Sequence, residues 1–166
     1  MFIESKNRKG LFEETDAVLA AKFSEAGMGF EEGGKSIFHP LDAAYLVKIG
    51  KARFEKFATT EKFIAAEKRK NRLFPFAFAV YFPIRQTGRL IRPYVKKTNF
   101  FRVYAPGTGR LDCRPSQLVC LLPGEVPSAK TLAEEVRIAH LARLDLIVAC
   151  GTEKQAKFYK ISSFNW

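Results

Sequence analysis

The spacing of apolar residues changes near Pro75, from a helix-like pattern before it to a strand-like pattern after it. In the first part the pattern predicts three helices, at residues 12–26, 39–49 and 60–74. Gly27 and Gly50 supply stops for the first two helices, and a turn-rich segment lies at residues 29–40. Residues 1–75 are therefore expected to form a small, mostly helical α+β domain.

After Pro75 the chain reads as one apolar helix followed by short runs rich in β-branched and aromatic residues. The helix is predicted over residues 76–88, with Gly88 in its final turn. Strand-like runs follow at residues 89–97, 99–105, 116–123, 144–150 and 157–164, and glycine or proline separates several of them. Residues 76–166 are therefore expected to form a second, compact domain.

A further helix is predicted between the third and fourth of these runs, from about Ser128 to Arg143. Thr131 and Glu134 have the spacing of a capping box, although Ser128 is an alternative start. One sector of this helix, which would face a sheet, holds Leu132, Val136, Ala139 and His140. The element order αβ(β)βαββ follows, and the fold class is expected to be α+β or α/β.

The net charge is the feature of the composition that says most about the kind of partner the protein binds. The chain has 28 Lys and Arg against 17 Asp and Glu, a formal net charge of +11. Residues 1–76 contribute +3 of this charge and residues 77–166 contribute +8. Such a balance favours an anionic partner through counterion release and electrostatic steering, and nucleic acid is the leading candidate.

The sequence lacks the patterns of a membrane span, a secretion signal and a zinc or disulfide motif. No apolar run approaches the roughly 20 residues of a membrane span, and the N-terminus lacks the apolar core of a secretion signal. We therefore expect a cytoplasmic protein without a membrane partner. Cys113, Cys120 and Cys150 show no CxxC spacing, which argues against a zinc site or disulfide framework and for reduced thiols.

One basic cluster stands out just before Pro75 and consists of Lys68, Arg69, Lys70 and Arg72. Two interpretations are open for it. The cluster is either a solvated helix end or linker, or a surface that contacts RNA phosphates.

Five segments of the chain resemble the archaeal-type tRNA-splicing endonucleases. AVYFPIRQTGRLIRP resembles the family's helix and turn, and NFFRVYAPG resembles its Asp-Phe-x-Val-Tyr strand. SQLVCLLP is similar to the family's Tyr-Leu-Val strand, and VRIAHLARLDLIVAC to its Val-Arg-x-Ala-His helix and following strand. KSIFHPLDAAYLVKIGKARF resembles a segment of its N-terminal domain. The resemblance spans roughly residues 35–166.

The resemblance implies a fold and a chemistry. The C-terminal domain would be nuclease-like, with a central mixed β-sheet flanked by helices. The family cleaves RNA with the neighbouring 2′-hydroxyl as nucleophile, which leaves a cyclic phosphate and requires no metal or other cofactor. This reaction needs a general base, a general acid and a cation beside the phosphate, and family members use a tyrosine, a histidine and a lysine.

The sequence departs from the family at two of these three positions. Tyr104 matches the tyrosine, but Arg114 occupies the histidine position and Leu144 the lysine position. Arginine does not exchange a proton near neutral pH, and leucine carries no charge. His140 is interpreted as a packing residue and His39 as a turn or helix-cap residue. Tyr104 is then either a vestigial catalytic group or a strand-end aromatic residue.

The resemblance explains this loss, because some family members combine a catalytic chain with an architectural one. We expect this chain to be the structural subunit of a heterotetramer with two copies of each chain, acting on precursor tRNA at bulge-helix-bulge motifs. Its predicted interface comprises Glu153, Phe158, Tyr159, Ile161, Phe164 and Trp166. The C-terminal strand could instead only close its own sheet, and Glu153 could be a solvated turn residue.

RNA contacts are predicted at Arg137, Arg110 and Lys160. Arg137 matches a helix arginine that in the family can stack on a bulged base, a role that suits a planar guanidinium. A solvated arginine paired with Glu134 is the other interpretation. Two alternative functions also stay open. One is a catalytic subunit that uses Tyr104 with Arg114 as a phosphate clamp, and the other is a stand-alone basic RNA-binding protein.

Overall fold

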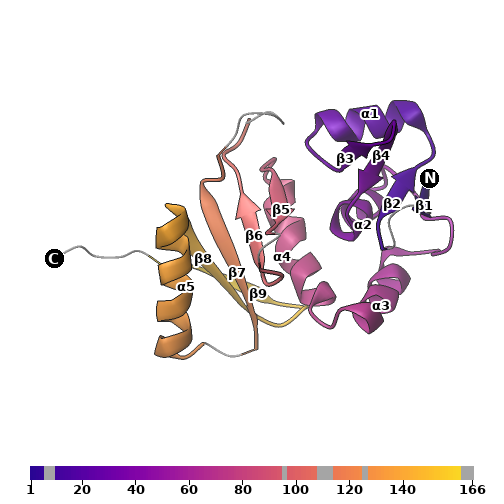
Figure 1. The fold of residues 1–166 in the computed structure, drawn as a ribbon. Helices are drawn as coiled ribbons and strands as arrows, with labels where there is room; N and C mark the ends of the chain where they lie inside the picture. The colour runs from indigo at the N-terminus through magenta and orange to yellow at the C-terminus, as the bar shows by residue number, and fades with distance from the viewer. Residues whose placement is uncertain (6–9, 95–96, 108–113, 125–126, 162–166) are drawn as a thin grey trace. The chain divides into compact units, whose positions relative to one another are not determined.

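The computed structural model describes residues 1–5, 10–94, 97–107, 114–124 and 127–161, and these form two compact units. The first unit spans Met1–Phe74, and the second begins at Pro75. Each unit has its own sheet (Figure 1). The mixture of helices with an antiparallel sheet and a mixed sheet confirms the predicted fold class.

The first unit contains more strand than the sequence pattern indicated. Its elements are β1 (Phe2–Glu4), β2 (Phe12–Glu14), α1 (Ala17–Glu25), β3 (Phe30–Glu32), β4 (Lys35–Phe38), α2 (Pro40–Lys48) and α3 (Thr60–Lys70). The four strands form an antiparallel sheet in the order β1-β2-β4-β3. The three expected helices are present, but the pattern did not indicate the four strands, because strands of three or four residues are too short to show a periodicity of two.

Phe12 illustrates this correction. It was assigned to a helix, but it lies in β2 opposite Phe38 of β4, and both side chains are buried. The helix begins only after Asp16, whose carboxylate accepts hydrogen bonds from the backbone N–H groups of Val18 and Leu19. A tertiary contact has thus overridden the local helix pattern at Phe12.

Aromatic side chains form the core of the first unit. Phe63 of α3 is fully buried and stacks on Phe54 with ring centroids 4.2 Å apart. Phe12 and Phe74 contact the Phe63 ring edge-to-face. These contacts fix which side of α3 faces the core, because the ring of Phe63 is its principal anchor.

His39 caps α2, as the sequence predicted. Its Nδ1 atom accepts a hydrogen bond of 3.2 Å from the backbone N–H of Leu41, and Pro40 occupies the first helical position. Burial lowers the pKa of His39 below its ordinary value of 6.5, and this outweighs the opposing effects of Asp42 and Glu67. The cap therefore requires a neutral imidazole.

The second unit has the predicted order of elements. They are α4 (Phe74–Gln86), β5 (Ile91–Pro93), β6 (Phe100–Val103), β7 (Gln117–Pro123), α5 (Ala129–Ala142), β8 (Asp145–Gly151) and β9 (Ala156–Ile161). The sheet order is β5-β6-β7-β8-β9, with β7 and β8 parallel and the other neighbours antiparallel. Helices α4 and α5 lie on opposite sides of this sheet (Figure 1).

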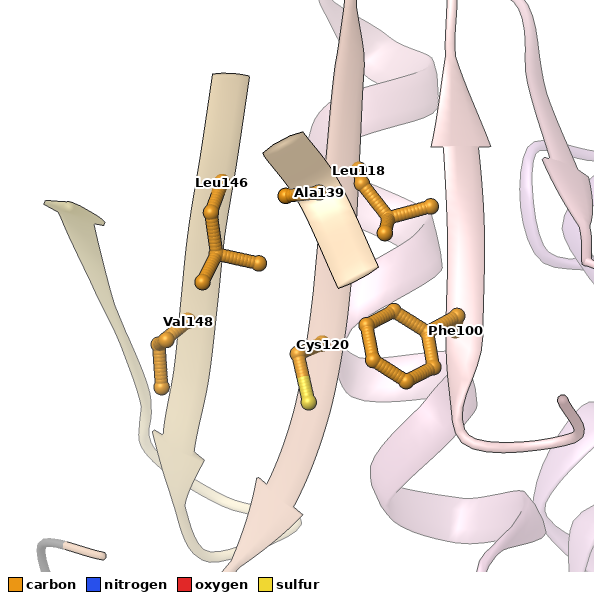
Figure 2. Packing of buried hydrophobic residues seen from close by; sticks show 6 residues of the cluster. All are labelled: Phe100, Leu118, Cys120, Ala139, Leu146 and Val148. Carbon is orange, nitrogen blue, oxygen red and sulfur yellow. The ribbon is translucent and has the colours of Figure 1, made fainter. Parts of the chain in front are cut away.

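Helix α5 packs on the sheet through a compact apolar cluster (Figure 2). The buried members are Phe100, Leu118, Cys120, Ala139, Leu146 and Val148. On the opposite face of the sheet, Phe101 contacts Tyr81 of α4 edge-to-face at 6.0 Å. Successive residues of β6 thus supply the cores on both faces, as the alternation of side chains in a strand requires.

The structure decides between the two starts left open for α5, and one expectation about this helix was wrong. Ser128 caps the helix, because its side chain accepts from the Thr131 backbone N–H at 3.2 Å. His140 is exposed, so it is not a packing residue. The buried side of α5 instead includes Glu135, which forms an ion pair of 3.8 Å with Lys97.

The two cysteines in the described part of the chain agree with the prediction of reduced thiols. Cys120 and Cys150 are buried and unpaired, whereas Cys113 lies outside the described residues. Burial, reinforced by the nearby Glu135, raises the pKa of Cys120 to about 12, so its thiol stays protonated. Among the helices of the described residues, none is long and apolar enough to cross a membrane.

We predict a pH dependence of stability that arises from His39. Because its pKa is lowered on folding, the unfolded chain binds more protons below pH 6.5. Stability from the neutral cap is therefore fully present above pH 6.5 and is lost as the pH falls toward the folded pKa. Urea unfolding of the wild type and of His39→Asn at pH 5 to 8 tests this. The variant, whose cap does not titrate, should lose less stability on acidification, and parallel curves would contradict the assignment.

Candidate functional site

Three segments that the sequence singled out meet at one end of the second sheet. Val103 of β6, Gln117 of β7 and Asp145 of β8 form one row across the three strands. The Ser116 backbone N–H donates to the Val103 carbonyl at 2.9 Å, and the Asp145 N–H donates to the Ser116 carbonyl at 3.3 Å. Residues next to this row, at positions 104, 114 and 144, are therefore brought to the same end of the sheet.

Leu144 at this end closes helix α5. The backbone N–H of Leu144 donates to the Ala139 carbonyl at 3.0 Å, and that of Arg143 donates to the His140 carbonyl at 2.9 Å. Arg143 adopts the left-handed conformation with φ 55°. This pattern is a Schellman motif, in which the residue after the left-handed position packs its apolar side chain against the helix end. The half-buried Leu144 does so against the α5 cluster.

Tyr104 and Arg114 differ in their access to solvent. Tyr104 directly follows β6, its side chain is buried, and its backbone N–H donates to the Leu90 carbonyl at 2.9 Å. Arg114 precedes β7 and is exposed. The exposed group at this end of the sheet is thus a permanent cation without a transferable proton near pH 7, whereas the phenol-bearing residue lies in the interior.

A small pocket of about 180 Å³ lies beside Leu144. His140 and Lys160 also line it, so an imidazole and an amine of this chain lie beside Leu144. Tyr104 does not line this pocket. The ammonium of Lys160 is held at 2.8 Å by the carboxylate of Asp145. The described side chains therefore do not assemble a tyrosine, an imidazole and an amine around one point.

Arg137 lies on the exposed side of α5. The structure describes both Arg137 and Glu134 and shows no ion pair between them. The exposure of Arg137 agrees both with an RNA contact and with a solvated helix arginine, and only the pairing with Glu134 is not seen. Arg110, the other arginine predicted to contact RNA, lies outside the described residues.

Strand β9 forms one edge of the second sheet. It pairs with β8 on one side, and among the described residues it has no strand partner on the other. Phe158 and Tyr159 are 41% and 46% exposed, and Ile161 is partly buried. Phe158 borders an open, largely apolar groove of about 490 Å³, which the Pro83–Ile84 part of α4 also lines. Phe164 and Trp166 lie outside the described residues.

The turn between β8 and β9 is short and ordered by its own hydrogen bonds. The backbone N–H of Gln155 donates to the Thr152 carbonyl at 3.1 Å and also to its hydroxyl. Gly151 has φ 110°, and a Cβ atom there would lie 2.4 Å from the Gln155 carbonyl oxygen, so only glycine fits. Glu153 is exposed at the tip of this turn.

Sequence reasoning missed one charged group at the other end of the sheet. Glu135 of α5 is buried near Cys120 and forms an ion pair with Lys97, whose ammonium also lies 5.4 Å from the Phe100 ring centroid. The two partners are 38 positions apart, and no local pattern signals their contact. A buried charge with a single distant cation is a packing feature that only the fold can reveal.

Comparison with known proteins supports the resemblance. A protein named tRNA-splicing endonuclease from Thermococcus onnurineus is 26% identical over 155 residues, which is 90% of this chain and 89% of the relative. One of the same name from Pyrococcus abyssi is 27% identical, covering 84% of this chain and 82% of the relative. A third, from Thermococcus gammatolerans, is 29% identical over 77% of each chain. No protein-family model matches the chain.

The order of elements, the motif positions and these near-full-length matches agree. The chain is an α+β protein related to archaeal RNA-processing nucleases. It is similar, over most of its length, to archaeal proteins named tRNA-splicing endonuclease.

We predict that Leu144 stabilises the end of α5. Leu144→Ala should lower the free energy of unfolding by about 1–2 kcal/mol, because it removes a half-buried apolar contact. Leu141→Ala is the matched control on the same helix, since Leu141 is 75% exposed, and it should change stability by less than about 0.5 kcal/mol. Denaturant unfolding measures both, and equal effects would rule out the packing role.

Proposed function

We propose that this chain is the structural, non-catalytic subunit of a heteromeric tRNA-splicing endonuclease that removes introns from precursor tRNA at bulge-helix-bulge motifs. One observation carries the proposal. The position at which the family has a catalytic lysine holds Leu144, whose side chain packs against the helix end. The ammonium that lines the pocket beside Leu144, that of Lys160, is held by Asp145 at 2.8 Å and so is not available to the charge that develops on phosphorus.

The surroundings of Leu144 support this interpretation. Arg114 is exposed at the histidine position, where a general acid is needed to protonate the leaving oxygen. Tyr104 is buried, which suits a strand-end aromatic residue better than a base that reaches a ribose hydroxyl. The metal-independent, cyclic-phosphate-forming reaction would be performed by the partner chain.

The free edge of β9 is the surface that best fits assembly. Unpaired backbone N–H and C=O groups on an edge strand pair readily with another strand. Phe158 and Tyr159 would bury apolar area in such a contact, and the groove beside Phe158 could receive apolar side chains of the partner. Glu153, at the tip of the adjoining turn, is placed to meet a basic surface of another subunit. A two-plus-two heterotetramer in the cytoplasm is the assembly that we propose.

Basic groups of the second unit would contribute to RNA binding. Arg137, exposed and without an ion pair to Glu134, is suited to stack on a base or contact a phosphate. Arg110 is a further candidate. Lys160 remains one as well, but it would first have to exchange its ion pair with Asp145 for a phosphate contact.

The exposed edge of β9 disfavours the alternative of a stand-alone RNA-binding protein, which would have no need for large apolar residues there. The alternative of a catalytic subunit requires the phenol of Tyr104 to act as the base. Under that alternative, removal of the Tyr104 phenol oxygen would abolish cleavage.

We therefore predict that Tyr104→Phe leaves RNA cleavage unchanged. The purified chain alone should not cut an intron-containing precursor tRNA. A mixture with the catalytic endonuclease chain of the same organism should cut it at equal rates with wild type or Tyr104→Phe. Product analysis on denaturing gels measures both. Cleavage by this chain alone that Tyr104→Phe abolishes would establish the catalytic alternative.

A second prediction concerns assembly through β9. Phe158→Asp should weaken association with the catalytic chain at least tenfold, because it places a charge in an apolar contact. Phe30→Asp is the matched control, since Phe30 is 42% exposed in the first unit, close to the 41% of Phe158. Light scattering of the mixed chains should show a heteromer with the control but not with Phe158→Asp. Loss of assembly with both variants, or with neither, would argue against this interface.

A further inference from the structure

The modest net charge of the first unit conceals a strong separation of charge. Residues 1–47 contain five basic and eight acidic residues, a net charge of −3. Residues 48–72 contain nine basic and three acidic residues, a net charge of +6. We call residues 48–72 the basic segment. It comprises the end of α2, the connection to α3, the whole of α3 and the two residues after it.

All nine cations of the basic segment are exposed. They are Lys48, Lys51, Arg53, Lys56, Lys62, Lys68, Arg69, Lys70 and Arg72. Two of them are neutralised locally, since Lys48 binds Glu61 at 2.5 Å and Lys70 binds Glu67 at 2.7 Å. These pairs use two of the three carboxylates of the segment, and the segment keeps a net charge of +6.

The fold holds two of these cations on one side of α3. Phe63 and Glu67 face the core, and Phe63 is locked there by its stack on Phe54. Lys62 and Arg69 are seven residues apart, which is two helical turns, so they share a face about 10 Å apart along the axis. That face is directed away from Phe63, because 100° per residue places both cations more than 90° from it. The structure thus displays these two cations on a rigid element.

Helix-end stabilisation does not explain the whole segment. Cations in the last turn of a helix interact favourably with its dipole, which accounts for Lys68 and Arg69. Lys62, however, lies in the first turn of α3, where a cation is unfavourable. Lys51 and Lys56 lie outside any helix. Another constraint must therefore account for the accumulation of positive charge.

The composition of this surface favours a nucleic acid over a protein partner. Cores of protein interfaces are depleted in lysine and enriched in aromatic residues. The aromatic residues of the basic segment are buried or partly buried, and Ile49 is its one strongly exposed large apolar residue. Phosphate backbones, by contrast, bind dispersed lysine and arginine without apolar anchors.

We propose that the basic segment binds the phosphate backbone of precursor tRNA, with Lys62 and Arg69 as direct phosphate contacts. This inference rests on the proposed function and gives the first unit a part in it. The contact carries no sequence information, and it adds affinity and orients the substrate through counterion release.

Salt-dependent binding tests this proposal on the assembled complex with the catalytic chain. Lys62→Gln/Arg69→Gln should weaken binding of an intron-containing precursor tRNA several-fold at 100 mM salt. It should also reduce the slope of log K against log salt by about 1.5, since each phosphate contact contributes about 0.7 to 0.9. Lys22→Gln/Lys130→Gln removes the same charge from exposed positions outside the segment and should leave the slope unchanged.

The outcomes separate this inference from the proposed function. If the wild-type chain neither joins the catalytic chain nor supports cleavage, the proposed function fails and this inference fails with it. If the wild type does both but the two double variants bind RNA equally, only the role of the basic segment is overturned. Loss of association with the catalytic chain, at unchanged RNA affinity, would show a protein contact and would also overturn it.

Discussion

The parallel pairing of β7 and β8 is the constraint on which the second unit depends. Parallel neighbours require a crossover connection, and α5 supplies it. The helix must end close to the start of β8, and it must bury the apolar side of its surface against the sheet. Both demands are met at Ala139, which packs in the cluster and accepts the hydrogen bond that closes the helix at Leu144. The start of β8 is thereby aligned with Gln117 and Val103.

This alignment brings the segments around positions 104, 114 and 144 to one end of the sheet. A lysine after α5 would present its ammonium to the end of the sheet, but a leucine at the same point completes a Schellman motif. A histidine before β7 could exchange a proton, but an arginine there can only attract an anion. Under the proposed function, this end of the sheet would attract RNA without transferring a proton. The apolar edge at β9 fits a chain whose chemistry is completed by another.

The two units divide their tasks by charge and apolar surface. The second unit exposes Phe158 and Tyr159 on an edge strand, which suits protein contacts. The first unit exposes a basic segment on a helix anchored by Phe63, which suits contact with a polyanion. Rigid anchoring matters here because the backbone of a packed helix is already ordered, so a phosphate contact orders only the side chain. In this interpretation neither unit carries out chemistry, and both position the RNA and the catalytic chain.

Much of this protein was determined by its sequence alone. The order of elements in the second unit, the stop at Gly50, the cap at His39 and the replacements at positions 114 and 144 are local features, because backbone preference and side-chain chemistry act within a few residues. The tertiary structure decided the rest. Phe12 joins a strand because Phe38 lies opposite it, and α5 buries Glu135, which pairs with Lys97, while His140 is exposed. Such contacts join residues 26 and 38 positions apart, so their free energy is absent from any local pattern and arises only when the chain has folded.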